Sequence, residues 1–541
     1  MGGEKYGARL PQLISSLLLL FVYLCLTTPV AAKSDRDHSD SSPSLSKWNF
    51  RPIDSHLLDT GSPQPTKLVD GRSFKSDSQA ATIVDCNHEL AISAPSIPNN
   101  SLGIASVATP LFLTAKLFFA KATFSFSITS PGRHWLRLYF YPIPHPEYNL
   151  TEAIFTVQTN KFILLHDFQV PDSNALVFKE YLINIPQEEA SNTFSVTINP
   201  KQNGFAFLNA IELVSAPDTL ISDNATVAFP VGGQFSGLSN YALEVVHRLN
   251  VGGPLIAPIN DTLSRTWLPD NGFLDLANAA ENVSVNPRAV KYEDTGASPL
   301  IAPALVYATA DRMALTGTDN PQFNITWKMD VEQGYSYFIR MHFCDIVSKS
   351  LNNLYFRIYI NDLVVAPNLD LSSILGSLSV PYYKDFVLNA TNVTSGNIQV
   401  KLGTVPDLQI GSPDAILNGL EVMKMSNKAD SLNGLYDVKG TYYGETGNAK
   451  KIVAAVGLAM AATAMLLLGT VFVRWHKRPD DWEKRNSFSS WLLPLHASHS
   501  SFLSSKSGSR FGSNKSKSGY SGFYSSALGL GRVLHLQSCK K

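Results

Sequence analysis

The chain has 541 residues, and its 44 Lys and Arg balance its 44 Asp and Glu, so the formal net charge at pH 7 is zero. This balance gives no reason to expect nucleic acid as a partner. The zero charge hides an asymmetry, because residues 33–451 contain 30 basic and 40 acidic residues, whereas residues 474–541 contain 12 and 3. An acidic exported region suits a basic soluble ligand, and a basic cytosolic tail suits the anionic inner leaflet of a membrane.

The N-terminus has the pattern of a secretory signal peptide, which we expect to span residues 1–32. Lys5 and Arg9 precede the apolar run Leu13–Leu26, and small residues follow at the spacing that a signal peptidase accepts. A membrane anchor is the alternative, but the apolar run is short. The polar residues 33–52 are expected to be disordered.

The exported region contains an internal repeat, which is the most informative feature of the sequence. Four segments recur in the same order at offsets of 203, 201, 205 and 209 residues. This steady offset indicates a tandem duplication, with copies at residues 53–234 and 235–426 and a link at 235–250. The matched segments are HWLRLYFYP from His134 and YFIRMHFCD from Tyr337, FTVQTNKFILL from Phe155 and FRIYINDLVV from Phe356, FKEYLINI from Phe178 and YKDFVLNA from Tyr383, and FLNAIELVSAP from Phe207 and ILNGLEVMKMS from Ile416.

Each repeated segment alternates between two faces with a period of two residues. Leu136, Leu138 and Phe140 share one face, and Trp135 and Arg137 share the other. Such alternation, with many aromatic and β-branched residues, predicts strands. Convincing amphipathic helices are scarce in this region, and turn residues recur every 8–12 positions. We therefore predict an all-β fold of two tandem jelly-roll β-sandwiches.

The exported region has two cysteines, Cys86 and Cys344, which are too few to staple so long a chain. They either pair or remain as buried free thiols. The same region has eight Asn-x-Ser/Thr sequons, a density that fits the secretory route and predicts N-glycans. The sequons are at Asn99, Asn149, Asn224, Asn260, Asn282, Asn324, Asn389 and Asn392.

A second apolar run predicts one membrane span at residues 452–473, which is long enough to cross the hydrocarbon core of a bilayer. The signal peptide sets the direction, so we expect a type I protein of the plasma membrane with its N-terminus outside. Residues 427–451 would be a flexible stalk, and residues 474–541 a basic, Ser-rich, disordered tail in the cytosol. Candidate phosphorylation sites in this tail are Ser487, Ser489 and Ser490, which follow Lys484 and Arg485.

Several motifs resemble the plant malectin-like (Catharanthus-type) receptor-like kinases, closest to the Buddha's Paper Seal branch. They are PIDSHLLDTGS, HRLNVGGPLIAPINDTLSRTW, FIRMHFCDIVSKSLNNLYF, ILNGLEVMKMSN, and RPDDWEKRNSFSSWLLPLHA followed by ALGLGR. Two departures stand out. Thr60 stands where the family usually has a Cys, and after ALGLGR the chain has none of the phosphate-loop, HRD or DFG motifs of a kinase. We therefore expect no enzyme activity and no cofactor, and a receptor-like binder that does not signal alone.

Three functions compete at this stage. The resemblance implies a receptor that binds rapid alkalinisation factor peptides with a small glycosylphosphatidylinositol (GPI)-anchored co-receptor, in cell-wall integrity or pollen-tube growth. It also implies related receptor kinases as partners in hetero-oligomers. A carbohydrate-binding sensor of cell-wall polysaccharide is the second possibility, and a glycan hydrolase the third. No residue of a ligand site is assigned, because the sugar-binding residues of malectin do not map onto this chain one by one.

Matched residues in the repeat suggest chemistry that must be weighed against structural roles. Trp135 and Phe338 could stack on sugars, but their mid-strand positions favour a core role. Arg137 and Arg340 are expected to extend toward solvent or to pair with carboxylates of the strands.

Other polar residues give weaker signals. Glu212 and Glu421 also match across the repeat. A glycosidase needs two carboxyl groups that flank one glycosidic bond, and one equivalent Glu in each copy does not give such a pair. His496 and His499 are poor candidates for a metal site, since they lie in a Ser-rich tail. Asn250-Val251-Gly252-Gly253 is expected to be a turn that opens a strand.

Overall fold

A computed structural model of the chain divides it into two compact units, residues 1–444 and 445–541. Predicted features outside the described residues are the signal peptide, Asn99, and the tail with Ser487, Ser489, Ser490, His496 and His499. The structure describes residues 50–80, 84–97, 104–190, 193–294, 296–314, 324–405, 414–444, 463–473 and 476–477.

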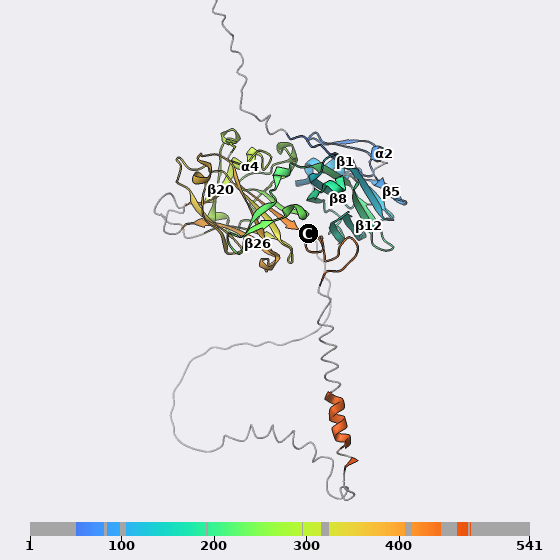
Figure 1. The fold of residues 1–541 in the computed structure, drawn as a ribbon. Helices are drawn as coiled ribbons and strands as arrows, with labels where there is room; N and C mark the ends of the chain where they lie inside the picture. Colours follow the sequence, from blue (N-terminus) through green and yellow to red (C-terminus); the bar gives the residue numbers. More distant parts are fainter. Residues whose placement is uncertain are drawn as a thin grey trace, which may run out of the picture. The chain divides into compact units, whose positions relative to one another are not determined.

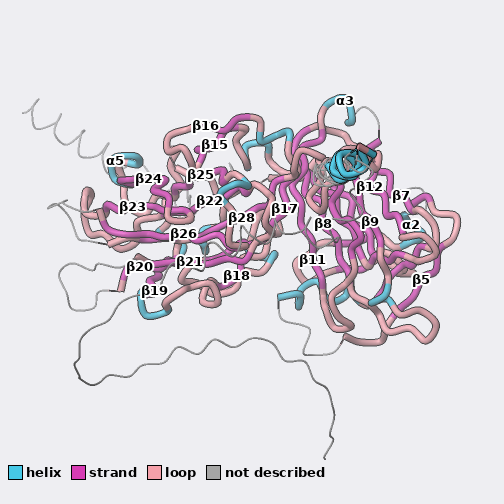
Figure 2. Tube along the Cα trace, turned by 90° about the horizontal axis from the view of Figure 1, so that it is seen from below, coloured by secondary structure: helices cyan, strands magenta, loops and turns pink. Residues whose placement is uncertain are grey.

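One sheet of eleven strands runs through both copies of the repeat. The two copies join where β11 pairs antiparallel with β17, through Tyr181 opposite Glu244 and Leu182 opposite Leu243. Figure 2 shows β17 between the strands of the two copies. The order of the sheet is β1 (Ser55–Asp59), β14 (Ala210–Ser215), β8 (Gly132–Phe140), β11 (Val177–Ile185), β17 (Leu243–Asn250), β28 (Gly419–Met425), β22 (Tyr337–Phe343), β25 (Tyr382–Leu388), β15 (Asn224–Val227) and β16 (Gln234–Ser236), with β18 (Leu268–Pro269) beside β17.

The duplication in the sequence recurs in the order of the strands. The run β1-β14-β8-β11 of the main sheet has the same order of matched strands as β17-β28-β22-β25. Each copy adds a second sheet, labelled in part in Figure 1. These second sheets are β10 (Ile163–Phe168), β9 (Phe155–Thr159), β12 (Thr193–Pro200), β7 (Ala122–Ser127) and β4 (Val84–Asp85) in the first copy, and β24 (Leu363–Asp370), β23 (Tyr355–Ile360), β26 (Asn397–Thr404) and β21 (Ile325–Asp330) in the second.

A small third sheet completes each copy. Even the β-bulges match, because the pairs Leu165–Val157 and Ala366–Ile358 stand at the same offset of 201 residues. The third sheets are β13 (Ala206–Leu208), β6 (Thr114–Phe118) and β5 (Glu89–Ser93), and β27 (Ile416–Leu417), β20 (Thr309–Met313) and β19 (Ala280–Ser284), while β2 (Thr66–Lys67) and β3 (Ser73–Phe74) form a separate ribbon.

Three hydrophobic cores follow from the predicted alternation. Leu136, Leu138 and Phe140 pack into the core between the main and second sheets of the first copy, and the second copy has its own equivalent core. Trp135 and Phe338 belong to a third core on the opposite face of the main sheet. The sheet is thus buried on both faces over much of its length, which explains why polar residues of its strands are also buried.

Helices in the described part of the chain are short, as the sequence predicts. They connect strands, and some of their apolar side chains fill the cores, such as Phe112 in the first, Leu375 in the second and Tyr307 in the third. The α-helices are α2 (Asp77–Ala80), α3 (Gln187–Ala190), α4 (Ala304–Tyr307) and α5 (Leu371–Leu375), and the 3₁₀ helices are Ile104–Phe112, Leu150–Glu152, Asp218–Leu220, Leu238–Asn240, Pro258–Asn260, Ala277–Ala279, Pro287–Ala289 and Ala390–Asn392.

Three sequence-based expectations are wrong. Residues 427–444 are not a disordered stalk, because Leu432 is fully buried in the first core and its N–H donates to the carbonyl of Ile163 at 2.8 Å. The link 235–250 is mostly strand β17, since its apolar residues complete the main sheet. The turn at Asn250 therefore ends a strand, where it was expected to open one.

Residues 463–473 are helical, in the C-terminal part of the predicted span. Among the residues that the structure describes, no helix is both long enough and apolar enough to cross a membrane. Residues 452–462 lie outside the described part, so the span itself stays a prediction.

Two matched asparagines tie the third sheet of each copy to the main sheet. Asn209 Oδ1 accepts the N–H of Tyr141 at 2.7 Å, and Asn418 Oδ1 accepts the N–H of Cys344, also at 2.7 Å. In both cases the side-chain nitrogen donates to a backbone carbonyl of the third sheet, at 2.7 and 2.8 Å. Both asparagines are fully buried, so these bonds satisfy groups that have no access to water.

Replacing Asn418 with Ala should lower the free energy of unfolding by about 2–3 kcal/mol, because several buried backbone groups lose their partner. Urea denaturation of residues 33–449 measures this change. The exposed Asn368→Ala is the matched control and should change stability by less than about 0.5 kcal/mol. Equal effects of the two variants would contradict the structural role of Asn418.

Candidate functional site

The candidate site is a cavity of about 430 Å³ where the two copies meet. Tyr139, Phe178 and Glu180 line it from the first copy, and Arg248 and Leu268 from the second. The cavity opens where β17 leaves the edge of β11 after only two paired residues. Its size and mixed lining suit a small ligand or the side chains of a peptide.

Two buried arginines share one carboxylate at this site. Glu180 accepts from Arg137 Nε at 2.7 Å through one oxygen, and from Arg248 Nη1 at 2.6 Å through the other. Arg137 lies on β8 of the first copy and Arg248 on β17 of the second. The side chains of all three are at most 4% exposed. Glu180 therefore links the two copies by buried charge, in addition to the short strand pairing.

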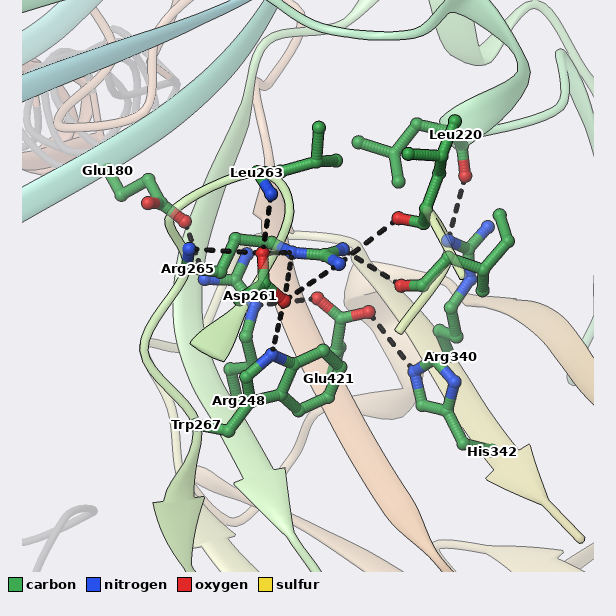
Figure 3. A network of polar contacts seen from close by, with 12 residues as sticks. Glu180, Leu220, Arg248, Asp261, Leu263, Arg265, Trp267, Arg340, His342 and Glu421 are labelled. Atoms are coloured by element: carbon green, nitrogen blue, oxygen red, sulfur yellow. Dashed lines mark hydrogen bonds and ion pairs between the residues drawn. The ribbon is translucent and has the colours of Figure 1, made fainter. Parts of the chain in front are cut away.

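The ion pairs continue in both directions from Glu180. In the first copy, Glu212 accepts from Arg137 at 3.3 Å and from Arg72 at 2.6 Å. In the second copy, Glu421 accepts from Arg248 at 2.8 Å and contacts His342 Nε2 at 3.2 Å. Figure 3 shows this part of the network around Arg248 and Glu421. The charges therefore neutralise one another across the sheet face.

Two tryptophans separate the arginines of this network. The guanidinium carbon of Arg248 lies 5.5 Å from the ring centre of Trp135 and 5.7 Å from that of Trp267. Each ring contacts a second arginine. Arg137 lies 5.6 Å from the ring centre of Trp135, and Arg265 lies 5.4 Å from that of Trp267. Cations at such distances are attracted to aromatic faces, and more strongly when water is excluded.

The electrostatics of the network keep its carboxylates ionised. Burial alone would raise the pKa of Glu180, but Arg248 and Arg137 outweigh this effect and hold its pKa below the usual value. Glu421 behaves in the same way, because Arg248 and a hydrogen bond from His342 overcome the effect of burial and lower its pKa.

His342 is neutral at physiological pH, because burial is the largest influence on its pKa and lowers it. Its Nδ1 lies 3.0 Å from the hydroxyl of Tyr307, and its Nε2 contacts Glu421. The tautomer that satisfies both contacts carries the proton on Nε2, accepts from Tyr307 and donates to Glu421.

The structure decides between the roles suggested for the matched residues. Trp135 and Phe338 are 2% and 0% exposed, so the core role is confirmed and neither can stack on a sugar. Arg137 and Arg340 pair with carboxylates and do not reach solvent, and Arg340 binds Asp385 through two nitrogens at 2.7 Å each. The pairing alternative is therefore confirmed.

Several residues of the site were missed by sequence reasoning. Glu180 and Asp385 occupy matched positions in FKEYLINI and YKDFVLNA, opposite the matched arginines in the sheet register. This shared acidic position was a signal that could have identified the partners of Arg137 and Arg340. Nothing local marks Arg248, because its partners are distant in the chain, and Arg72 has a local partner in Asp70 but reaches Glu212 only through the fold.

The cavity has no arrangement for catalysis among its described residues. Ser264 and Thr266 supply hydroxyls, but no His or Cys lines the cavity beside them. Glu212 pairs with Arg137 of the first copy and Glu421 with Arg248 of the second, so the two carboxyl groups do not flank a common site where a glycosidic bond could lie. In the described part of the chain, no group of three or more His, Cys, Asp or Glu could hold a metal ion.

A buried carboxyl pair lies elsewhere in the second copy. Asp270 accepts from the Gly252 N–H at 2.9 Å and from the Trp327 indole at 2.7 Å. Asp311 accepts from Asn282 Nδ2 at 2.6 Å. Both acids are fully buried, and neither lines either of the two cavities described for this chain. Asp270 thereby holds the turn that ends β17.

The cysteines do not pair. Cys344 is buried and Cys86 is partly exposed, and both are free thiols. The structure describes seven of the eight predicted glycan acceptors, and the side-chain nitrogen of one, Asn282, donates to Asp311. Asn149, Asn224, Asn260, Asn282 and Asn324 are exposed, Asn389 and Asn392 are half-buried, and Asn99 lies outside the described residues.

Comparison with known proteins identifies the family. The model of the malectin-like domain matches residues 58–425. A probable receptor-like protein kinase of Arabidopsis thaliana is 50% identical over 497 residues, which is 90% of this chain and 58% of that protein. The receptor-like protein kinase THESEUS 1 of the same plant is 39% identical over 438 residues, covering 81% of this chain and 48% of the relative. The chain belongs to the plant malectin-like receptor-like kinases.

Solved structures of this family have the same fold. The ANXUR1 extracellular domain from Arabidopsis thaliana superimposes with a TM-score of 0.63 at 26% identity, covering 70% of this chain and 99% of that domain. A structure of the peptide RALF23 in complex with FER and LLG2 gives a TM-score of 0.60 at 29% identity, over 71% of this chain and 98% of the matched one. The malectin-like chain spans about half the length of the curated relatives it matches.

Removing the shared charge should destabilise this malectin-like protein strongly. Glu180→Gln leaves Arg137 and Arg248 without a full counter-charge in a buried site, which should lower the free energy of unfolding by about 3–5 kcal/mol. The matched control is Asp167→Asn, because the Asp167–Lys201 pair at 3.0 Å is half-exposed and should contribute under about 1 kcal/mol. Equal losses in urea denaturation would rule out the buried network as a major source of stability.

The stability of the protein should also fall as the pH rises toward 8. Burial, followed by the charge of Asp270, raises the pKa of Asp311 to about 8, whereas the unfolded value is about 3.9. The folded state therefore holds a proton that the unfolded chain releases, and the resulting stabilisation is lost between these pH values.

Asp311→Asn imitates the protonated acid and should remove this loss. The variant should be more stable than the natural chain at pH 8, with a flatter profile of unfolding free energy between pH 5 and 8. Asp275→Asn, at an exposed position, is the control and should leave the profile unchanged. An Asp311→Asn profile as steep as that of the natural chain would show that Asp311 is ionised in the folded state.

Proposed function

We propose that this chain is the ligand-binding part of a plant cell-surface receptor, and that it recognises secreted basic peptides of the rapid alkalinisation factor class with a GPI-anchored co-receptor. The observation that supports this most is its likeness to the FER chain in the complex of FER with RALF23 and LLG2, of which it covers 98%. The biological setting we propose is cell-wall integrity or pollen-tube growth, with related receptor kinases as partners.

The charge of the exported region supports a basic ligand. Residues 33–451 have an excess of ten acidic residues, and the buried arginines of the junction are already paired with carboxylates. The acidic excess therefore acts mainly at the surface, where it attracts basic peptides over a distance of about one Debye length. This attraction raises the rate of association more than the final affinity.

Topology and modification form part of the same proposal. The protein would lie in the plasma membrane with residues 33–451 outside, held by the predicted span at 452–473. Exposure of five sequon asparagines supports N-glycans on this region. Ser487, Ser489 and Ser490 would be phosphorylated by another kinase, which would weaken the attraction of the basic tail to anionic lipid.

Carbohydrate binding is the second candidate. The malectin-like family and the apolar lining of the junction cavity favour it, because aromatic faces suit sugar rings. The burial of Trp135 and Phe338 counts against it, since those rings cannot reach a glycan. A glycan hydrolase has no support from a facing carboxyl pair.

The proposal predicts salt-sensitive peptide binding by the secreted ectodomain, residues 33–449. Biolayer interferometry with basic alkalinisation peptides, with and without co-receptor, should show an association rate that falls about tenfold between 50 and 300 mM NaCl, because exposed charges are screened. The dissociation rate should change much less. The ectodomain is a suitable sample, since its cores lie within residues 58–432.

A peptide with its Lys and Arg replaced by Gln is the matched control and should associate slowly at every salt concentration. Binding of cell-wall glucan or pectin fragments with no binding of any peptide would favour the carbohydrate sensor. Peptide binding that is insensitive to salt would remove the electrostatic argument while leaving the receptor function in place.

A further inference from the structure

A second and larger groove, of about 980 Å³, lies where residues 222–234, at the end of the first copy, face the second copy. It runs between the edge strand β24 of the second sheet and the β15–β16 hairpin at the end of the main sheet. Exposed apolar side chains border it, with Val231 at 53% and Ile374 at 44% exposure. Other residues of its lining are Gln234, Ala366, Asn368 and Lys384.

The matching edge strand in the first copy, β10, is covered by another segment of the chain. The Ile163 N–H donates to the Asp430 carbonyl at 3.0 Å, and the Leu432 N–H donates to the Ile163 carbonyl at 2.8 Å. The two segments run parallel, with Ile163 opposite Ser431. Leu432 is fully buried in the first core. An extended segment therefore adds to this edge and anchors itself with one aliphatic side chain.

The same position in the second copy is open. Val364 takes the position of Ile163 in the shared register. Val364 pairs with Tyr359 as Ile163 pairs with Gln158, and each residue of the second pair lies 201 positions before its counterpart in the first. Within the described residues, no backbone hydrogen bond joins Val364 to a segment outside its own sheet. The residues that follow it, from Val365 to Leu369, line the groove.

We propose that an extended segment of the peptide ligand runs parallel to β24 beside Val364, enters the groove that Val365–Leu369 line, and buries one aliphatic side chain there as Leu432 does in the first copy. The inference rests on the proposed function, namely that the ectodomain binds a secreted peptide. The backbone of β24 supplies the hydrogen bonds, and the apolar side chains of the groove select the aliphatic residue.

The chemistry of the groove sets limits on the segment that fits. Pro367 has no N–H, and the bulge at Ala366 bends the strand, so the peptide can pair only over a short stretch around Val364. Val365 and Leu369 are 4% exposed and form the base of the groove, which favours Leu, Ile or Val over a charged side chain. Asn368, Gln234 and Lys384 lie beside this apolar base and suit polar neighbours of the anchor.

The test uses the full-length chain in detergent and the same basic peptides with co-receptor. The double variant Val231→Asp/Ile374→Asp should bind at least tenfold more weakly, because it makes the groove polar. Both positions are exposed, so the fold should survive. Aspartate is chosen because added negative charge cannot repel a basic peptide. The matched control is Leu276→Asp/Leu351→Asp, at positions 61% and 41% exposed outside the groove, which should bind within twofold of the natural chain.

Hydrogen exchange gives a second readout. Peptide binding should slow the exchange of the amides of Val364, Val365 and Ala366. If the groove variant binds as well as the natural chain, or if these amides are unaffected, the groove proposal is overturned while the receptor function stands. If the natural chain binds no peptide, both fall together.

The glycan acceptor Asn224 also lines the groove, so the experiment is repeated with Asn224→Gln. The amides of Val364–Ala366 could exchange slowly in the glycosylated chain without peptide and rapidly in this variant. That difference would show that the chain's own glycan occupies the groove. That result would overturn the proposal.

Discussion

The shared carboxylate of Glu180 is the contact on which the junction of the two copies depends. Strands β11 and β17 pair over only two residues, so backbone hydrogen bonds alone make a short joint. Glu180 adds one ion pair to Arg137 in the first copy and one to Arg248 in the second. Because the side chains of these groups are at most 4% exposed, the loss of one charge would leave its partner buried without a full counter-charge.

This junction turns a duplicated sequence into one continuous structure. The first strand of the second copy, β17, pairs with the last strand of the first copy's run, β11, so the edge that each isolated copy would expose is covered. The stack of Arg137, Trp135, Arg248 and Trp267 then fills the face over the joint. The cavity at this place is therefore a consequence of how the strands diverge after their short pairing.

The two copies have the same framework but different surroundings. Segment 427–436 covers β10 in the first copy, and no described segment covers β24 in the second. The covering segment comes from residues that follow the second copy, so it is not part of the duplicated unit. A binding partner could therefore form backbone hydrogen bonds with β24 that the corresponding strand of the first copy, β10, already makes within the chain.

Sequence reasoning predicted much of the fold and less of the site. The repeat, the alternation of Leu136 and Leu138, and the buried roles of Trp135 and Phe338 follow from local patterns of side chains. The order of segment 427–444 was missed, because its single anchor, Leu432, has no periodic neighbours. The pairing of Arg137 with Glu180 was within reach, since the acidic position recurs in both copies.

The sequence by itself determined that residues 53–426 are a β-rich duplication with matched Arg, Asn and Glu positions. These features are set by residue type and spacing, which determine the strands and their faces. Only the tertiary structure decided that β17 joins the copies into one sheet, that Arg248 shares Glu180 with Arg137, and that no described segment covers β24 of the second copy. These contacts join residues far apart in the chain. Local residue patterns do not determine which distant charge or strand lies beside them, because that depends on how the whole chain packs.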